Sequence, residues 1–372
     1  MILQQSFTRD WLLKVNSDLN WNRRETQLKN LEKAVAALYL LECLSKANID
    51  FIFKGGTSLL LLLGKIYRLS VDIDLIIETP LTEPLKVFTQ VCSDSKLFFR
   101  FEKQVRETDS IFNTEHYKFF YRPFSVGIAT GIAAGIATGI ATGIEESFIL
   151  LDLYTMKDPY AKTIELALIS DVLCSDGDNV SIRMPDVDSI LGDKLTAFAP
   201  TTIGIPLSAE SGYRPKRVEV LKQLFDIGNL FDHVNNVAHI RETYRTIALH
   251  EIRMLGLDIT PDDTLRDSAR FATIIGHGGK IEKEQHESIE KGYKDFNKFV
   301  ADLSFDENQA ILAAAKTAYL VKVLLHDDNT IVKEDGTADM RAWEITDKAF
   351  VDFNDYKYSN PEAFFYWFKA LQ

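Results

Sequence analysis

The 372-residue sequence has few cysteines, and none of them is placed for a metal site or a disulfide framework. Cys43, Cys92 and Cys174 are odd in number and widely spaced, and the chain has no Cys-x-x-Cys pair. Scattered thiols of this kind are typical of proteins from reducing compartments, so we expect a reduced, cytoplasmic protein with buried cysteines. The seven histidines are equally scattered, and the sequence therefore indicates neither a zinc site nor a catalytic triad.

Uncharged runs of membrane-spanning length are also missing, with one exception. Residues 125–144 carry no charge, but they form a tandem Gly-Ile-Ala-Thr repeat that is too rich in glycine for a stable helix. We expect this insertion to be a mobile connection or a long hairpin arm; the alternative is an arm that touches a membrane or a partner. Residues 1–15 have Arg9 and Asp10 among their apolar residues, so we expect no secretory signal there and no membrane association.

Positive charge is in deficit, because 42 Lys and Arg face 54 Asp and Glu and give a net charge of −12. This balance disfavours broad, non-specific binding of nucleic acids but leaves room for a local basic patch. Such a patch is formed by Arg214, Lys216, Arg217 and Lys222. It follows the Thr-, Pro- and Gly-rich residues 200–206, the best candidate for a linker. The length suffices for two domains, which we place at residues 1–200 and 201–372.

The most informative stretch is residues 51–78, FIFKGGTSLLLLLGKIYRLSVDIDLIIE. Its pattern predicts a strand, a Gly-Gly turn, a helix from Thr57 to about Lys65, and a second strand that carries Asp72 and Asp74. Side chains on a strand alternate between its faces, so the two carboxylates share one face. Paired carboxylates repel unless a cation lies between them, and the pattern therefore indicates a hard metal ion such as Mg²⁺; a solvated acidic face is the alternative.

The glycines supply the other half of this motif. Gly55 and Gly56 allow a close approach of the backbone to a ligand, and the following helix offers unpaired N–H groups to a phosphate. Thr57 and Ser58 could add hydroxyl donors, although Gly-Gly-Thr-Ser is also compatible with an ordinary helix-capping turn. A phosphate cradle next to metal-binding carboxylates is the equipment of phosphoryl or nucleotidyl transfer.

The combination of Gly55-Gly56 with a following Asp72-x-Asp74 strand resembles the signature of polymerase-β-like nucleotidyltransferases. Within that superfamily, Lys54 to Leu59 and Arg68 to Leu75 are similar to the AbiEii/AbiGii family of toxin nucleotidyltransferases. Leu61 stands where many relatives carry a lysine, and Lys65 or Arg68 could replace that phosphate contact.

Three further residues are candidates from the rest of the chain. Asp152 interrupts the apolar strand 147–154, and a buried carboxylate is costly without a partner; the resemblance implies a third metal ligand there, whereas Lys157 is the simpler partner. Lys194 lies on a predicted helix over 186–199, where the resemblance implies a nucleotide contact and a solvated lysine is the alternative. Asp226 matches the last acid of the family's Lys-Asp-x-x-Asp element, in which Gln223 replaces the first acid.

The resemblance implies an α/β (α+β) polymerase-β-like core with a mixed sheet, followed by a mostly α-helical C-terminal domain. It implies a nucleotidyltransferase that uses two Mg²⁺ ions and an NTP, with RNA, and tRNA 3′ ends in particular, as the acceptor. It also implies a toxin that is controlled by a separate antitoxin protein. Two alternatives remain open: a nucleotide-binding or partner-binding module without catalysis, and a glycosyltransferase with a metal-binding Asp-x-Asp motif.

Helical spacing of apolar residues further predicts helices over 7–18, 25–47, 81–92, 237–255, 263–275, 282–303, 307–326 and 361–371, and one that begins near Leu221. Aromatic and β-branched residues predict strands over 97–105, 116–122, 163–168 and 180–184.

Overall fold

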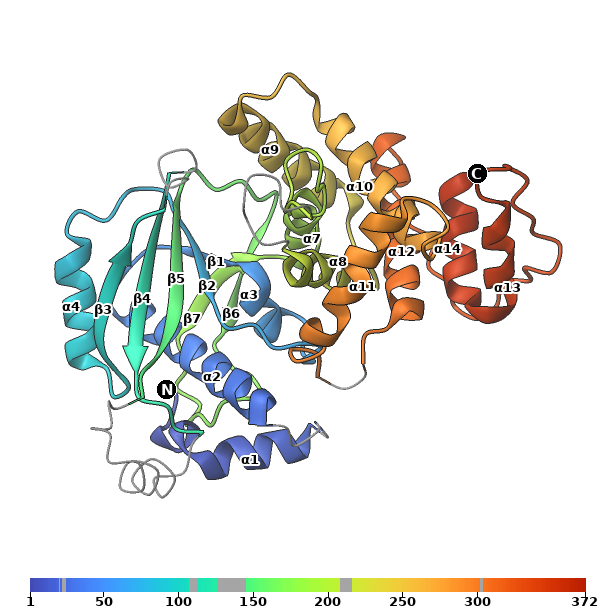
Figure 1. Ribbon diagram of the computed structural model, residues 1–372. Helices are drawn as coiled ribbons and strands as arrows, with labels where there is room; N and C mark the ends of the chain where they lie inside the picture. Colours follow the sequence, from blue (N-terminus) through green and yellow to red (C-terminus); the bar gives the residue numbers. More distant parts are fainter. Residues whose placement is uncertain (20, 22–24, 107–112, 126–144, 208–215, 302–303) are drawn as a thin grey trace. The chain divides into compact units, whose positions relative to one another are not determined.

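A computed structural model describes the chain except for residues 20, 22–24, 107–112, 126–144, 208–215 and 302–303 (Figure 1). The chain divides into two compact units. The first holds Met1–Asp158, Thr163–Pro185 and Lys298–Leu303; the second holds Pro159–Lys162, Asp186–Asn297 and Ser304–Gln372. Almost all of the Gly-Ile-Ala-Thr repeat and the basic residue Arg214 lie outside the described residues.

The unit boundary at residues 185 and 186 differs from the expected domain boundary at 200 and 201. The difference arises because helix α7 (Val187–Ala197) packs against α8 (Arg217–Phe231) and α9 (Val237–Leu255). Lys194 therefore belongs to the second unit together with Asp226.

The first unit is built on a five-stranded mixed sheet. The strands are β1 (Ile52–Lys54), β2 (Ile73–Ile77), β3 (Phe98–Gln104), β4 (Thr114–Tyr121) and β5 (Ser147–Thr155), in the order β1-β2-β5-β4-β3. β2 and β5 run parallel, and every other neighbouring pair of this sheet is antiparallel. β6 (Thr163–Ala167) and β7 (Ser181–Pro185) form a separate antiparallel pair. The mixed sheet that the family resemblance implies is thus confirmed.

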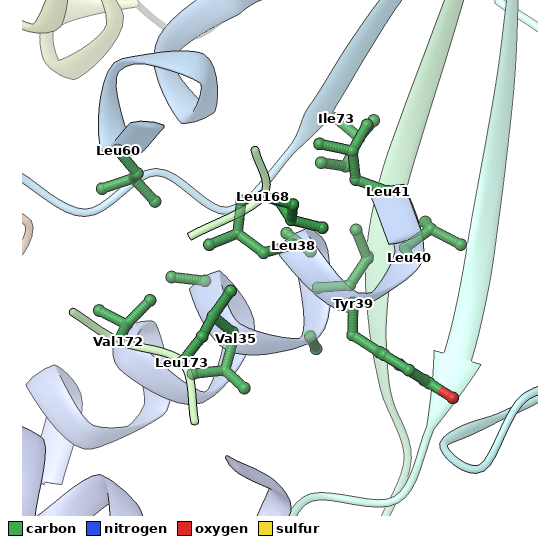
Figure 2. Packing of buried hydrophobic residues seen from close by; sticks show 14 of the residues in the cluster. Val35, Leu38, Tyr39, Leu40, Leu41, Leu60, Ile73, Leu168, Val172 and Leu173 are labelled. Atoms are coloured by element: carbon green, nitrogen blue, oxygen red, sulfur yellow. The ribbon is translucent and has the colours of Figure 1, made fainter. Parts of the chain in front are cut away.

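The helices of the first unit are α1 (Arg9–Asp18), α2 (Glu25–Lys46), α3 (Gly55–Leu62) and α4 (Pro84–Asp94), preceded by the short 3-10 helix η1 (Gln4–Phe7). α2 forms the centre of the core. Figure 2 shows Val35, Leu38 and Leu41 of α2 among Leu60, Ile73 and the segment around Leu168 to Leu173. Val35, Leu38 and Leu41 are fully buried, and burial of one such side chain stabilises the fold by about 1.5–3 kcal/mol.

Strand β4 shows why the two faces of the sheet differ. Tyr117, Phe119 and Tyr121 are fully buried, and Phe88 of α4 meets Tyr117 and Phe119 edge to face, with ring centroids 4.7 Å and 5.3 Å apart. Of the alternate residues of the strand, Lys118 and Phe120 are only partly buried, whereas Thr114 and His116 are buried. Because side chains alternate along a strand, β4 presents an aromatic core face and a second face of different character.

In the described part of the second unit, the regular elements are helices. Besides α7, α8 and α9 they are α10 (Pro261–Gly276), α11 (Lys283–Phe296), α12 (Glu307–Leu325), η3 (Val351–Asp355), α13 (Tyr356–Ser359) and α14 (Pro361–Leu371). Capping residues define the ends of several of these helices. The Asp186 side chain accepts from the Ser189 N–H at the start of α7, Thr260 and Asp263 form a capping box on α10, and Gly256 ends α9 with φ of 64°.

The helix predicted over residues 282–303 is wrong after Phe296. α11 ends at Phe296, and the backbone that follows pairs with the first unit instead. The Leu69 N–H donates to the Phe299 carbonyl at 2.7 Å, and the Ala301 N–H donates to the Tyr67 carbonyl at 3.0 Å. These inter-segment bonds replace the helical ones, which helical periodicity alone could not reveal.

Two further expectations concern thiols and membranes. All three cysteines are free and partly buried, and burial raises the pKa of the Cys43 thiol to about 11. Among the helices that the structure describes, none is both long enough and apolar enough to cross a membrane.

Candidate functional site

The glycine pair forms the first turn of α3, and neighbouring side chains lie directly against it. Gly55 has φ of +79°, and a methyl group at its Cα would lie 2.0 Å from Oδ2 of Asp74. A methyl group at Gly56 would lie 2.4 Å from Nη2 of Arg68 and 2.9 Å from Oγ of Ser70. Glycine at Gly55 is therefore required for both space and backbone conformation, whereas a side chain at Gly56 would have to displace the ends of the Arg68 and Ser70 side chains.

Thr57 and Ser58 are fully buried, and their hydroxyls bond to the backbone of the same motif. Thr57 Oγ1 donates to the Asp72 carbonyl at 2.5 Å, and Ser58 Oγ donates to the Gly55 carbonyl at 2.8 Å. The first contact connects the start of α3 to the chain that leads into β2. In this arrangement the two hydroxyls stabilise the glycine turn.

Of the two predicted replacements for the missing lysine, Arg68 lies at the glycine turn. Arg68 is 5% exposed, and its Nη1 donates to the Leu69 carbonyl at 3.1 Å. Lys65 is exposed, and its ammonium lies 5.4 Å from the centroid of the Tyr67 ring. The structure thus brings a buried guanidinium to Gly56, whereas Lys65 lies at the surface of the unit.

The parallel pairing of β2 with β5 brings two of the three predicted acids side by side. Asp74 is the direct partner of Asp152, and Lys54 of β1 is the antiparallel partner of Asp74. Residues paired in this way project from the same face of the sheet at adjacent positions, about 5 Å apart in Cα. Asp72 immediately precedes β2, two residues before Asp74. Carboxylate oxygens are the donor type that Mg²⁺ prefers. Among the described residues, however, the three predicted acids do not form a group whose ligand atoms all lie within 4.8 Å of one another.

Asp152 has a partner that the sequence analysis did not identify. It is 8% exposed, and its Oδ1 lies 2.6 Å from Nδ1 of His116, itself 5% exposed. His116 is its direct cross-strand partner on β4, and Arg106 Nη1 lies 4.0 Å from Oδ2. These contacts, rather than the simpler partner Lys157, hold the carboxylate. His116 could have been suspected only from the register of two strands 36 residues apart.

Lys194 and Asp226 form a buried ion pair within the second unit. Lys194 Nζ lies 2.9 Å from Oδ2 of Asp226, and the two side chains are 8% and 1% exposed. The alternative of a solvated helix lysine is therefore wrong. Two desolvated charges at this distance depend on one another, because either alone would be a buried uncompensated charge.

A second acidic cluster lies at the junction of α7 with α9. In the described residues, the group whose ligand atoms all lie within 4.8 Å of one another is Asp186, Asp188 and His239. The oxygens of Asp188 accept the N–H groups of Asn235 and Asn236 at 2.9 Å and 3.0 Å, while Asp186 caps α7 and contacts His239. Burial raises the pKa of Asp188. These backbone contacts give the cluster a structural role in joining the two helices.

Comparison with known proteins agrees with the motif. The family described as "Nucleotidyl transferase AbiEii toxin, Type IV TA system" matches residues 39–318, which include the glycine turn, all three acids and the buried ion pair. No curated protein matches the chain.

Proposed function

The chain belongs to the AbiEii nucleotidyltransferase toxin family, and from this premise we propose that it transfers a nucleoside monophosphate from an NTP to the hydroxyl of an RNA acceptor. The observation that carries the proposal is the pairing of Asp74 with Asp152 beside the glycine turn. A phosphate-binding helix start and two adjacent carboxylates are the parts that in-line nucleotidyl transfer requires. The polymerase-β-like character of the core is part of this proposal.

The triphosphate would bind at the first turn of α3. Gly55 and Gly56 have no side chains of their own to shield their backbone N–H groups, and the dipole of α3 favours negative charge there. The Arg68 guanidinium beside Gly56 adds a fixed positive charge, and Lys65, which is exposed, is proposed as a second cation. Thr57 and Ser58 hold the turn in place through their hydroxyls.

The three acids are proposed to bind the metal ions and to orient the acceptor hydroxyl. Asp72, Asp74 and Asp152 would hold two Mg²⁺ ions, which supply charge neutralisation at the triphosphate and activation of the attacking hydroxyl. Asp152, fixed by His116, would orient that hydroxyl and accept its proton. The hydroxyl then attacks the α-phosphate in line, and pyrophosphate leaves.

Lys194 and Asp226 are proposed nucleotide-binding residues on the strength of the family resemblance. Their buried ion pair supports the proposal in one respect: Asp226 fixes the lysine side chain in a single conformation, as a binding residue requires. The acceptor is proposed to be a tRNA 3′ end. A type IV toxin family also implies a separate antitoxin protein as partner.

The test is transfer itself. Purified protein is incubated with each α-labelled NTP, Mg²⁺ and total RNA, and labelled RNA is resolved on a gel. Asp74→Asn and Asp152→Asn should each lower the rate by at least about 10²-fold, because each removes a charge that is needed in the transition state. The matched control is Asp50→Asn, since Asp50 is 89% exposed in its side chain and pairs only at the surface with Arg183.

The same experiment separates the alternatives. NTP binding without any labelled product would favour a non-catalytic binding module. Label transferred from a nucleoside diphosphate sugar, and not from an NTP, would favour a glycosyltransferase. Loss of cooperative unfolding in Asp74→Asn and Asp152→Asn would show that the acids are structural.

A further inference from the structure

The face of the sheet that carries Asp152 continues into a surface of aromatic and basic side chains. Phe120 of β4 and Phe148 of β5 are direct cross-strand partners, and their ring centroids lie 5.8 Å apart. Both rings are only partly buried, whereas Phe119, the neighbour of Phe120, is fully buried on the opposite face. Two adjacent phenylalanines on the partly exposed face of a sheet are not explained by the core of the protein.

Three cations lie over these rings. Lys118 Nζ is 4.3 Å from the centroid of Phe148, and Lys33 Nζ of α2 is 5.3 Å from it. The Arg100 guanidinium carbon lies 3.5 Å from the centroid of Phe120. We call Lys33, Arg100, Lys118, Phe120 and Phe148 the aromatic–basic face. Arg100 also forms ion pairs with Glu102 and Glu146, so Lys33 and Lys118 provide most of the positive charge that a ligand would meet.

This face is continuous with the proposed catalytic acids. On β5, Phe148, Leu150 and Asp152 alternate along one side of the strand, and on β4 Lys118 follows His116 in the same way. At about 3.3 Å per residue, Phe148 lies roughly 13 Å along β5 from Asp152. An extended chain whose terminal hydroxyl reaches Asp152 would therefore cross both rings.

We propose that the aromatic–basic face binds the single-stranded 3′ end of the RNA acceptor, an inference that rests on the proposed function. Unpaired bases stack on Phe120 and Phe148, and phosphates contact Lys33 and Lys118. Aromatic rings interleaved with cations on an open sheet are the surface that single-stranded nucleic acids require, since every base offers a face for stacking. Paired bases cannot stack in this way. The net charge of −12 further disfavours a ligand held by many phosphate contacts alone.

The test uses a short, 5′-fluorescent, single-stranded RNA with a free 3′ hydroxyl, and its binding to the full-length protein is followed by anisotropy without NTP or Mg²⁺. Phe148→Leu keeps an apolar side chain and removes the ring, so the Kd should rise about tenfold; Phe148→Trp should bind at least as tightly as the original protein. Lys118→Gln should reduce the slope of log Kd against log salt by about 0.7, as for one lost single-strand contact. A blunt RNA duplex should bind more weakly and respond little to Phe148→Leu.

Thermal unfolding of each variant checks that the fold is kept, and Phe148→Trp provides a second variant if Phe148→Leu is destabilised. The proposal is overturned if the protein does not bind this RNA, if the duplex binds equally well, or if Phe120→Leu/Phe148→Leu binds within twofold of the original protein. Because binding is measured without NTP, the two hypotheses fail separately. If the original protein transfers nucleotides but the double variant binds RNA as tightly as the original, RNA binding by the aromatic–basic face is rejected. If the double variant binds RNA more weakly but the original protein transfers no nucleotide, the enzymatic function is rejected.

Discussion

The Cα of Gly55 and the carboxylate of Asp74 are in direct contact, since a methyl group on Gly55 would lie 2.0 Å from Oδ2 of Asp74. This contact joins the glycine turn to the acidic half of the motif, from which it is separated in sequence by the rest of α3 and the segment that leads into β2. It explains why glycine precedes the Asp-x-Asp strand, and it can be tested separately from the conformational role of glycine.

Gly55→Ala should impair both folding and transfer, and Gly64→Ala should impair folding alone. Both glycines have positive φ, +79° and +63°, but nothing lies within 4 Å of a methyl group at Gly64. The left-handed conformation costs alanine about 1–2 kcal/mol at either site. Urea unfolding and transfer kinetics of the two variants would measure the additional effect at Gly55, for which we expect at least about a tenfold lower kcat. Equal effects of the two substitutions would contradict a specific contact with Asp74.

His116 should position Asp152. His116→Ala removes the partner 2.6 Å from the carboxylate, and a buried acceptor without its partner costs about 1–3 kcal/mol. His116→Asn retains an N–H donor near the position of Nδ1 and should restore part of both stability and kcat. KM for the NTP should stay within about twofold in both variants, because the glycine turn is untouched. A kcat that is the same for Ala and Asn would show that His116 acts only through packing.

The contact between His116 and Asp152 is a feature that could not be predicted from the sequence alone. The apolar run 147–154 correctly predicted that Asp152 lies on a strand, and the family resemblance correctly implied a mixed sheet. The partners of a strand depend on long-range pairing, and a shift of one residue would move His116 to the other face. The pairing of Asp74 with Asp152 likewise depends on the long-range register of two strands. The Asp-x-Asp pattern supplied Asp72 and Asp74 as candidates, and the resemblance added Asp152, but only the strand register brings Asp74 and Asp152 together.

Other differences have local physical causes. The helix predicted from Thr57 begins at Gly55, because the glycine pair itself forms the first turn. The boundary expected at residue 200 moves to residue 185, because burial of α7 against α8 and α9 outweighs the loop-like composition of residues 200–206. Composition identifies loops that can be linkers, whereas packing decides which loop separates the units.

Substitutions of Lys194 and Asp226 should have non-additive effects on the free energy of unfolding but not on the rate of transfer. Lys194→Met or Asp226→Leu alone leaves a buried charge uncompensated and should cost about 3–5 kcal/mol. The double variant removes both charges, so its loss should be well below the sum of the two. If Lys194 also contacts the nucleotide, transfer will stay low in the double variant although stability returns. Recovery of both quantities would assign the pair to folding alone, and additive losses of stability would contradict the coupling.

Lys216 offers a test of the basic patch as an alternative site for RNA. It is exposed at the start of α8, whereas Arg217 is partly buried with its Nε 2.9 Å from Oγ of Ser288. Lys216→Glu is therefore the cleaner variant, and a negative charge at a helix start should stabilise the fold by about 0.3–1 kcal/mol. If Lys216 contacts a phosphate, the KM for RNA will rise and its salt dependence will fall by about one unit of log–log slope, with the NTP KM unchanged.

The matched control is Lys283→Glu, because Lys283 is the first residue of α11 and its side chain is 79% exposed. It makes the same change of charge at a comparable helix start of the same unit. Equal weakening of RNA binding by both variants would indicate a general effect of net charge, which grows from −12 by two units in each case. Weakening by Lys216→Glu alone would extend the RNA-binding surface to the second unit. If neither variant changes RNA binding, Lys216 is a solvated lysine, and phosphate contacts must come from other residues such as Lys33 and Lys118.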